Sequence, residues 1–463
     1  MEATKLFTIF EKQKNFVQLN NQNSFANIQK RLLNFVSVYK MHQKELIETI
    51  NSCYNSSLWD VLYYEIKIIN REIDYFVKNI KKFANSFSFK NKLNAFMFAK
   101  PITINQPYGS VLLLFNHVFP LSKIFRLILA ALVCGNVVVA KLPKLNVELA
   151  NLVKKIFSSA YNENLLYFLD ENISEADLKA VSDFGFDLIY YNGDSETAKS
   201  LVRNYATKFC KVVYEIRNKN PVIVDETADL NKAAKKIVFS KLLFSGQTEQ
   251  SIDFLVIHES IIQNFITALR SEFQKQFDKE DSIKNFTKIG TNAEFEEINN
   301  TLKKFLVKNR IIFGDHNNFD QKINFILIQV DDLKSNLLLD DIASPILPVV
   351  IFNSFADVKG IIEHNDCPKC VYVFSKNKSR INQLLNDVES CNFVVNDTML
   401  PYLNNLEFGG IKYSGSNLLG AFQSLSTFSY KRYLIYKTRT SKKTYLNVKA
   451  KNEIAKQKIA KIK

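Results

Sequence analysis

The sequence predicts an α/β fold with two parallel sheets, preceded by a helical segment. From residue 107 to about 214, short apolar runs alternate with segments of helical periodicity, and the alternation returns over residues 215–400. Such alternation requires parallel strands joined by right-handed crossovers, with helices covering the faces of each sheet. Residues 1–98 show only the spacing of helices. The predicted order is therefore a helical segment followed by two α/β units.

The helical segment, residues 1–98, is predicted to serve core packing and to carry no chemistry. Its apolar residues recur at helical spacing in two runs. The first run is Ile28, Leu32, Leu33, Val36 and Tyr39, and the second is Leu58, Val61, Leu62, Ile66 and Ile69.

The strands of both units are predicted from short apolar runs that alternate with helical segments. In the first unit they lie at 111–115, 137–140 and 188–191, with helices near 121–133 and 146–160. In the second unit they lie at 254–257, 325–330, 348–352, 371–374 and 393–395.

Positive charge is concentrated at the C-terminal end. Residues 431–463 contain 12 of the 61 Lys and Arg residues and only one acid, Glu453, so the rest of the chain is nearly neutral. A basic tail of this kind is a solvated extension, a ligand for an anionic membrane surface, or a nucleic-acid contact. We favour the solvated extension and place nucleic acid last.

No segment predicts secretion or a membrane span. The most apolar stretch, residues 127–140, is too short for a bilayer and is interrupted at Gly135. The expectation is a cytoplasmic protein, with membrane-peripheral attachment through the tail as an alternative, and the six Cys are expected to be free thiols. His364, Cys367 and Cys370 are too few for zinc, so no metal is predicted.

Several motifs, taken together and in order, resemble the aldehyde dehydrogenase superfamily, in particular its class-3-like branch. The leading one is Lys241-Leu-Leu-Phe-Ser-Gly-Gln-Thr-Glu-Gln250, which is similar to the family's active-site segment. The others are Pro107–Leu114, Gly135–Lys141, Glu215–Pro221, Pro345–Pro348, Tyr372–Ser375, Val395–Asp397, Phe408–Gly410 and Thr427–Ser429. Each motif alone is weak, whereas the ordered set is specific.

The resemblance implies a Rossmann-like nucleotide domain, a second α/β domain and an oligomerisation hairpin, and it suggests these boundaries. Residues 1–98 form the helical part, 99–214 the nucleotide domain, 215–400 the catalytic-type domain, 401–436 the return segment with an oligomerisation strand, and 437–463 the basic tail. A homodimer is expected through the hairpin arm at 99–106 and a strand near 430–436.

The residue at the family's nucleophile position is Glu249. Family chemistry uses a cysteine thiolate here, which attacks the aldehyde before hydride passes to NAD or NADP. A carboxylate is a poor nucleophile toward an aldehyde, and its adduct reverts before it gives up hydride. This substitution is predicted to remove most of the activity.

Other positions of the family's active site are altered or retained. Val118 stands where the resemblance places the oxyanion-binding Asn, and loss of one such donor costs about 3 kcal/mol of transition-state stabilisation. Asn116 and His117 are neighbours that we do not expect to substitute. Glu215 keeps the base position. Arg217 replaces a Gly and is hypothesised to lie across the cleft and pair with Glu249 or Glu215.

The cofactor implied by the resemblance is NAD or NADP, on a degraded site. Lys141 matches the ribose-binding lysine, but Lys144 reverses the charge of a usual acid. Gly193 is retained, whereas Asp194 would cap its own helix and repel pyrophosphate. Asp341 matches a Glu that holds the nicotinamide ribose. Cofactor binding is therefore doubtful.

Three functions stay open on this basis. The preferred one is a catalytically deficient family member that serves as a structural or interaction protein. The second is an active NAD(P)-dependent aldehyde oxidoreductase with a rearranged site. The third is a membrane- or nucleic-acid-associated scaffold that acts through residues 437–463.

Overall fold

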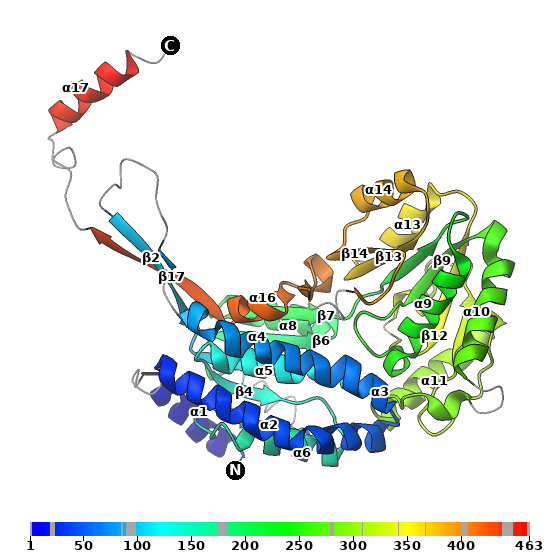
Figure 1. Ribbon diagram of the computed structural model, residues 1–463, viewed down its shortest axis with the longest axis horizontal. Coiled ribbons are helices and arrows are strands. Elements are labelled where there is room, and N and C mark those ends of the chain that lie inside the picture. The colour runs from blue at the N-terminus through cyan, green and yellow to red at the C-terminus, as the bar shows by residue number, and fades with distance from the viewer. Residues whose placement is uncertain are drawn as a thin grey trace.

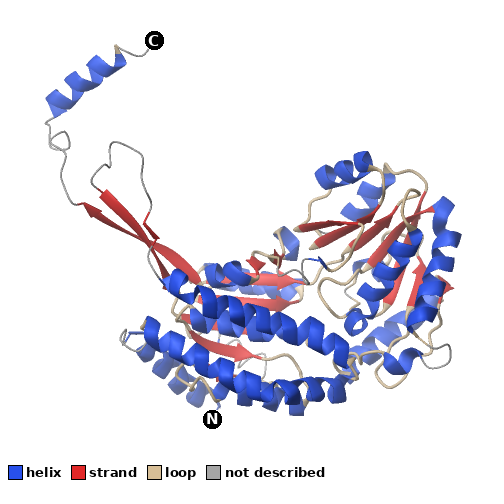
Figure 2. Ribbon diagram, viewed as in Figure 1, coloured by secondary structure: helices blue, strands red, loops and turns tan. Residues whose placement is uncertain are grey.

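The computed structural model describes residues 2–18, 24–84, 87–88, 99–173, 181, 183–277, 282–307, 309–340, 342–365, 367–400, 406–437 and 448–460. Two parallel sheets, each covered by helices on both faces, form the body (Figures 1 and 2). The predicted α/β fold with parallel sheets is confirmed.

The N-terminal segment is mainly helical, as predicted. Its elements are α1 (Glu2–Gln18), α2 (Phe25–Tyr54), α3 (Leu58–Val61), the π-helix η2 (Leu62–Ile66) and α4 (Lys67–Ala84). One part of the expectation is wrong, because β1 (Phe87–Ser88) pairs with β2 and is not helical. Backbone pairing across the arm overrides the helical pattern there.

The first sheet has five parallel strands in the order β5-β4-β3-β6-β7. They are β3 (Ser110–Phe115), β4 (Val137–Lys141), β5 (Leu166–Phe168), β6 (Leu188–Gly193) and β7 (Lys211–Ile216), joined by α5 (Leu121–Val133), α6 (Val147–Ser158) and α8 (Ser195–Ala206). Strand β3 shows why both faces need cover. Val111 and Leu113 belong to the core formed with α2, α4 and α5, whereas Leu112 and Leu114 belong to the core on the opposite face, which includes Leu6 and Phe10 of α1.

The second sheet has seven strands in the order β10-β11-β12-β9-β8-β13-β14. They are β8 (Pro221–Val224), β9 (Phe254–His258), β10 (Arg310–Phe313), β11 (Ile326–Gln329), β12 (Ile346–Phe352), β13 (Cys370–Phe374) and β14 (Asn392–Val395). Only the β10–β11 pair is antiparallel. Its helices are α9 (Leu230–Leu242), α10 (Ile262–Gln276), α11 (Asn292–Leu306), α12 (Asn336–Leu339), α13 (Asp357–Glu363) and α14 (Lys378–Asp387), with 3-10 turns η4 (Leu243–Gly246), η5 (Glu259–Ile261) and η6 (Ser282–Asn285).

The return segment leads from the second sheet back to an arm that projects from the body (Figure 1). It contains β15 (Phe408–Gly409), η7 (Lys412–Ser414), β16 (Leu418–Leu419), α16 (Ala421–Thr427) and β17 (Ser429–Lys437). Strand β17 pairs antiparallel with β2 (Ala99–Pro107) along its whole length, and with β1 these strands form the arm. Helix α17 (Val448–Ile459) lies beyond the arm.

The two sheets bring the carboxyl end of β7 and the beginning of β13 close to the turn after α9.

Within the described residues, no helix is long and apolar enough to cross a membrane.

Candidate functional site

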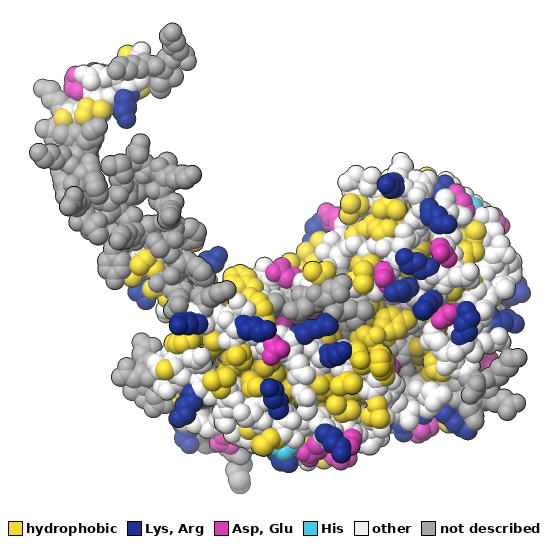
Figure 3. Space-filling view, viewed as in Figure 1, with side chains coloured by type: hydrophobic (Ala, Val, Ile, Leu, Met, Phe, Trp, Pro, Cys, Tyr) yellow, Lys and Arg dark blue, Asp and Glu magenta, His cyan; other side chains and the backbone are white. Residues whose placement is uncertain are grey.

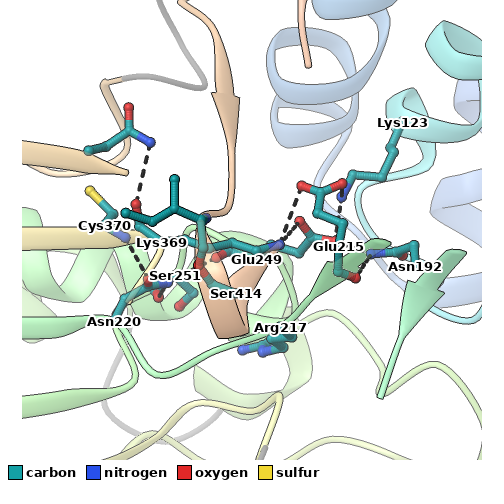
Figure 4. A network of polar contacts seen from close by, with 12 residues as sticks. Lys123, Asn192, Glu215, Arg217, Asn220, Glu249, Ser251, Lys369, Cys370 and Ser414 are labelled. Carbon is teal, nitrogen blue, oxygen red and sulfur yellow. Dashed lines mark hydrogen bonds and ion pairs between the residues drawn. The ribbon is translucent and has the colours of Figure 1, made fainter. Parts of the chain in front are cut away.

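Two carboxylates and two lysines meet in the space between the sheets (Figure 4). Lys123 Nζ lies 2.9 Å from Glu215 Oε2 and also forms an ion pair with Glu249 Oε1. Lys369 Nζ lies 2.7 Å from Glu249 Oε2 and 3.3 Å from Glu215 Oε1. None of the four side chains is more than 12% exposed. The charges of this ion-pair cluster therefore balance where water is largely excluded.

Two neutral donors complete the cluster. The Tyr190 hydroxyl donates to Glu215 Oε2 at 2.6 Å, and Asn192 Nδ2 donates to Glu249 Oε1 at 2.6 Å. Buried charges are stable only when they are paired and hydrogen-bonded, and both carboxylates meet this requirement.

The cluster fixes the ionisation of its members. Burial alone would raise the pKa of Glu249, but the charges of Lys123 and Lys369 outweigh it and hold that pKa well below its usual range. Burial alone would lower the pKa of Lys369, yet the carboxylates of Glu215 and Glu249 raise it. Lys369 is therefore an ammonium without a lone pair, and Glu249 is a fully engaged anion, so neither is a free nucleophile.

The cluster is assembled from segments far apart in the sequence. Lys123 lies in the first turn of α5, and Asn192 and Glu215 lie near the ends of β6 and β7. Lys369 directly precedes β13. Glu249 follows the η4 turn that ends α9. Because the carboxyl ends of β6 and β7 face the turn after α9, side chains from both sheets converge.

The η4 turn has an unusual backbone. Phe244, Ser245 and Gly246 have φ values of 47°, 53° and 70°, all in the left-handed region that favours glycine. A Cβ on Gly246 would lie 2.6 Å from the carbonyl oxygen of Ser344. This turn directs the residues that follow it, including Glu249, into the cluster. Only glycine fits at position 246.

The expected pairing of Arg217 is wrong. Its Nη1 donates to the carbonyl of Gln247 at 2.8 Å, and its Nη2 donates to the carbonyl of Gly246 at 2.9 Å and to Asp253 Oδ1 at 3.1 Å. The guanidinium thus stabilises the turn at Gly246 and Gln247 by hydrogen bonds to its carbonyl groups. The charged partners of Glu215 and Glu249 are the ammonium groups of Lys123 and Lys369. The Arg217 guanidinium bonds to the turn and to Asp253 instead.

Val118 and its neighbours do not face the cluster. Val118 lines a separate cavity of about 380 Å³, together with His117. Asn116 Nδ2 donates to the Tyr191 hydroxyl at 3.1 Å. Val118 has an apolar side chain and cannot donate a hydrogen bond to an oxyanion.

A long cleft runs along the carboxyl ends of the first sheet. It consists of two cavities of about 870 and 960 Å³, and Arg203 lines both. Lys141, the last residue of β4, lines the smaller cavity, and Gly193 and Asp194 line the larger one. The structure thus brings these predicted cofactor residues to one cleft, whereas Asp341 lies outside the described residues.

Asp194 caps helix α8, as expected. Its Oδ1 accepts from the backbone N–H of Thr197 at 2.8 Å, and its Oδ2 accepts from the Tyr191 hydroxyl at 2.6 Å. Burial would raise the pKa of Asp194, but these hydrogen bonds outweigh it and lower that pKa. The helix end where a phosphate would bind thus carries a fixed negative charge.

Gly193 has a local reason to be glycine. A Cβ there would lie 2.3 Å from the Tyr191 hydroxyl oxygen and 2.6 Å from Asn116 Nδ2. The Tyr191 hydroxyl that holds Asp194 occupies that space, so Gly193 serves this hydrogen-bond network.

A third cavity borders the ion-pair cluster and is very small. Lys123, Glu215 and Glu249 line it together with both apolar and polar residues, Arg126 among them, and its volume is about 40 Å³. That is room for a few water molecules only. Among the described residues, none lines both this cavity and the cleft of about 960 Å³.

From the sequence, His364, Cys367 and Cys370 are too few to form a zinc site, and no metal is predicted. Cys370 is the first residue of β13. The described part of the chain contains no group of three or more His, Cys, Asp or Glu that could hold a metal ion.

Sequence reasoning identified Glu215 and Glu249 but missed Lys123, Lys369 and Asn192. One signal existed for Lys369, because a charged residue directly before the buried run of β13 requires a partner. Lys123 lies in the first turn of an otherwise apolar helix, where a lysine is normally exposed. For Asn192 we find no signal in the sequence.

Known proteins resemble this chain in sequence and in fold. The model of the aldehyde dehydrogenase family matches residues 11–436. The chain is 23% identical over 432 residues to the 4,4′-diaponeurosporen-aldehyde dehydrogenase of Staphylococcus aureus, covering 93% of each chain. It is 25% identical to the "Aldehyde dehydrogenase, dimeric NADP-preferring" of Canis lupus familiaris, covering 85% of this chain and 86% of that one.

A solved structure extends the match to the fold. The substrate-bound state of Staphylococcus aureus AldH superposes with a TM-score of 0.91 at 22% identity, covering 98% of this chain and 99% of that one. The family match spans nearly the whole body of the molecule, from α1 to β17. The chain therefore belongs to the aldehyde dehydrogenase family.

Proposed function

We propose that this chain is a catalytically silent aldehyde dehydrogenase family protein, in which Glu249 occupies the nucleophile position. The observation that carries the proposal is the ion-pair cluster, in which the Glu249 carboxylate lies between the ammonium groups of Lys123 and Lys369. A structural or interaction role is the function that remains.

The chemistry of the cluster opposes aldehyde oxidation at each step. Nucleophilic attack needs an available lone pair, but the Glu249 oxygens accept from Lys123, Lys369 and Asn192. Hydrolysis of an acyl intermediate needs a base, but Glu215 is held by the same lysines and by Tyr190. The adjoining cavity of about 40 Å³ holds no aldehyde of ordinary size.

Membership of the family supports NAD or NADP as the cofactor by resemblance. The residues of this chain fit only part of such a dinucleotide. The cleft has room and positive charge for the adenosine half. Toward the nicotinamide half the residues are less suited, because the Asp194 carboxylate caps α8 where pyrophosphate would lie and Asn192 is already bonded to Glu249. We therefore derive no step through the cofactor.

Turnover by the full-length protein tests the proposal. NADH and NADPH formation is measured with aliphatic, aromatic and long-chain aldehydes, and we expect none above the uncatalysed rate. Formation that is abolished in the variant Glu215→Gln would establish a working rearranged site and overturn the proposal. Formation that survives in Glu215→Gln would be assigned to a contaminating enzyme and would leave the proposal standing.

We also propose that the chain forms a homodimer through the β2–β17 arm. Strand β17 is the edge of the three-stranded sheet, and Tyr430 and Tyr433 on it are exposed. An uncovered edge strand of nine residues is a pairing surface for another strand. A second copy of the same arm is complementary to it by symmetry.

For the basic tail, we propose a solvated extension, with an anionic membrane surface as the alternative partner. Lys451, Lys456 and Lys458 of α17 are exposed, and Ile459 gives the helix only a small apolar surface. Figure 3 shows charges of both signs intermixed over one face of the body. By sequence, residues 431–463 contain 12 Lys and Arg and a single acid.

A further inference from the structure

Three of the six cysteines lie at one edge of the second sheet. Cys370 is the first residue of β13, Cys367 lies three positions before it, and Cys391 directly precedes β14. Strands β13 and β14 are parallel neighbours, so the three thiols gather at the amino ends of two adjacent strands. The remaining cysteines lie on separate elements, namely Cys53 in α2, Cys134 at the end of α5 and Cys210 before β7.

The pairing of the two segments brings Cys367 close to Cys391. At the start of β14, the backbone N–H of Asn392 donates to the carbonyl of Lys369 at 2.9 Å. Two positions further back, the Cys367 thiol donates to the carbonyl of Glu389 at 3.5 Å. Cys367 thus lies opposite residue 389, and Cys391 follows that residue by two positions. The two thiols are therefore diagonal neighbours across the two segments.

The Cys391 thiol is within electrostatic reach of Cys367 and of the ion-pair cluster. Burial raises the pKa of Cys391, and the charges of Cys367 and Glu215 raise it further, whereas the Lys369 ammonium lowers it. Cys391 is therefore a neighbour both of the second thiol and of two members of the cluster.

Cys367 is the thiol that an oxidant reaches first. It is partly exposed, whereas Cys370 is fully buried, and burial raises the pKa of Cys370 to about 12. Lys412 lies close to Cys367, because its pKa is raised first by its ion pair with Glu389 and also by the charge of Cys367. A partly exposed thiol beside a cation is the kind that reacts with oxidants.

A bond between the two sulfur atoms requires only a small movement of the backbone. Diagonal neighbours on adjacent strands lie about 7–8 Å apart between their Cα atoms, and a disulfide needs about 4.4–6.8 Å. Cys367 precedes β13 and Cys391 precedes β14, so both residues lie outside the regular ladder. An approach of about 1 Å between the two segments is sufficient.

We propose that Cys367 and Cys391 are a peroxide-reactive thiol pair, and that their oxidation forms a reversible disulfide that ties β14 to the segment carrying Lys369. In the first step, the Cys367 sulfur attacks one oxygen of hydrogen peroxide, the O–O bond breaks, and a sulfenic acid and one water form. In the second step, the Cys391 sulfur attacks the sulfenic sulfur, the S–O bond breaks, and the hydroxide leaves with the thiol proton as a second water. Two thiols are thus oxidised by two electrons, and the peroxide is reduced to water.

The disulfide would add a covalent link next to the ion-pair cluster, because Lys369 lies between Cys367 and β13. The inference goes beyond the proposed function and does not depend on it, since neither step uses an aldehyde or a nucleotide.

Peptide mapping of the full-length protein tests this proposal. The reduced protein is treated with an equimolar amount of hydrogen peroxide, its remaining thiols are blocked with iodoacetamide, and it is digested with trypsin without a reductant. Cleavage after Lys and Arg places the three cysteines on separate peptides, residues 360–369, 370–376 and 381–412. We expect the first and third peptides to form one cross-linked species, two hydrogens lighter than their sum, which dithiothreitol separates.

Single substitutions assign the cross-link to its two thiols. Cys391→Ser should abolish it and leave Cys367 as a sulfenic acid that dimedone traps. Cys53→Ser removes a partly buried thiol of α2 and should leave the cross-link intact. In the wild type, iodoacetamide applied to the folded protein before peroxide should alkylate Cys367 and prevent the cross-link, which requires no variant to fold.

Four results would overturn the proposal. They are unlinked peptides after peroxide treatment, a link through peptide 370–376, a cross-link that persists in Cys391→Ser, and a link found only in protein of doubled mass on non-reducing electrophoresis. In the last case the two thiols would belong to different chains.

Discussion

At the scale of single residues, one acid determines the arrangement of its surroundings. A buried carboxylate at position 249 requires positive partners, and Lys123 of α5 and Lys369, directly before β13, supply them from the two α/β units. Glu215 then becomes the fourth member, because two lysines need two acids for neutrality. Under the proposed function, the position that resembles the family's nucleophile serves instead as a structural contact between the two α/β units.

The first prediction concerns the stability that this contact provides. Glu249→Gln leaves two buried lysines with one acid, and removal of one partner from a buried pair costs about 3–5 kcal/mol of the free energy of unfolding. Urea unfolding at neutral pH measures the change. Glu259→Gln is the matched control on the exposed η5 turn and should change the free energy by less than about 0.5 kcal/mol. Equal small effects in both variants would refute a structural role for Glu249.

The second prediction is a pH dependence of the same difference. The pKa of Glu249 is lowered in the folded state, so its stabilisation is present above its ordinary value of about 4.3 and is lost as the pH falls through the folded value. The pKa of Lys369 is raised, so its contribution is complete below about pH 10 and is lost only at higher pH. The stability gap between wild type and Glu249→Gln should therefore narrow as the pH falls from about 5 to about 3. Urea unfolding across this range measures it, and a gap that widens in acid would contradict the assignment.

At the scale of elements, the η4 turn directs residue 249 into the cluster. Gly246 has a φ of 70° and lies against the Ser344 carbonyl, so a side chain there is both strained and crowded. Gln247 fixes the next step, since its Nε2 donates to the carbonyls of Phe244 and Lys288, each at 2.9 Å. The loop is therefore rigid even though its backbone is irregular.

The third prediction tests this turn with a pair of glycines. Gly246→Ala should lower the free energy of unfolding by about 2 kcal/mol or more, from the left-handed backbone and the close contact. Gly360→Ala lies in helix α13 with nothing within 4 Å of its new Cβ, and it should raise stability by about 0.4–1 kcal/mol. Urea unfolding of both variants decides, and a Gly246→Ala variant as stable as wild type would show that the turn relaxes freely.

Many of the elements were predictable from the sequence, whereas the strands β5, β7, β8 and β10 and the partners in the site were not. Strands such as β4 and β13 follow from local apolar runs, and α5 follows from its helical spacing, because both patterns are written in consecutive residues. Glu215 and Glu249 were found by resemblance. Lys123 and Lys369 come from distant segments whose meeting depends on the packing of both sheets, and Arg217 was assigned the wrong partner for the same reason. The short strand β1 was also not predicted, because it forms by pairing with β2, which is a separate segment of the chain.

At the scale of the whole molecule, the β2–β17 arm projects from the body, and side chains on it are exposed (Figure 1). Tyr433 and Leu434 are 63% and 37% exposed, and consecutive strand residues point to opposite faces. Both faces of the arm are thus open at this point, together with the free edge of β17. An extended edge with apolar side chains is unfavourable for a monomer, so a second copy is the simplest cover.

The last prediction is that this arm sets the oligomeric state. Light scattering during gel filtration should give a mass of twice the 53.4 kDa of the chain. The double variant Tyr433→Glu and Leu434→Glu places charges on both faces of β17 and should shift the mass to 53.4 kDa. Val307→Glu adds a charge at a site that is 83% exposed on the body and should leave the dimer intact. A wild-type mass of one chain would refute the dimer. A dimer that persists in the double variant would place the interface elsewhere, because charges buried at a symmetric contact face their own copies and repel.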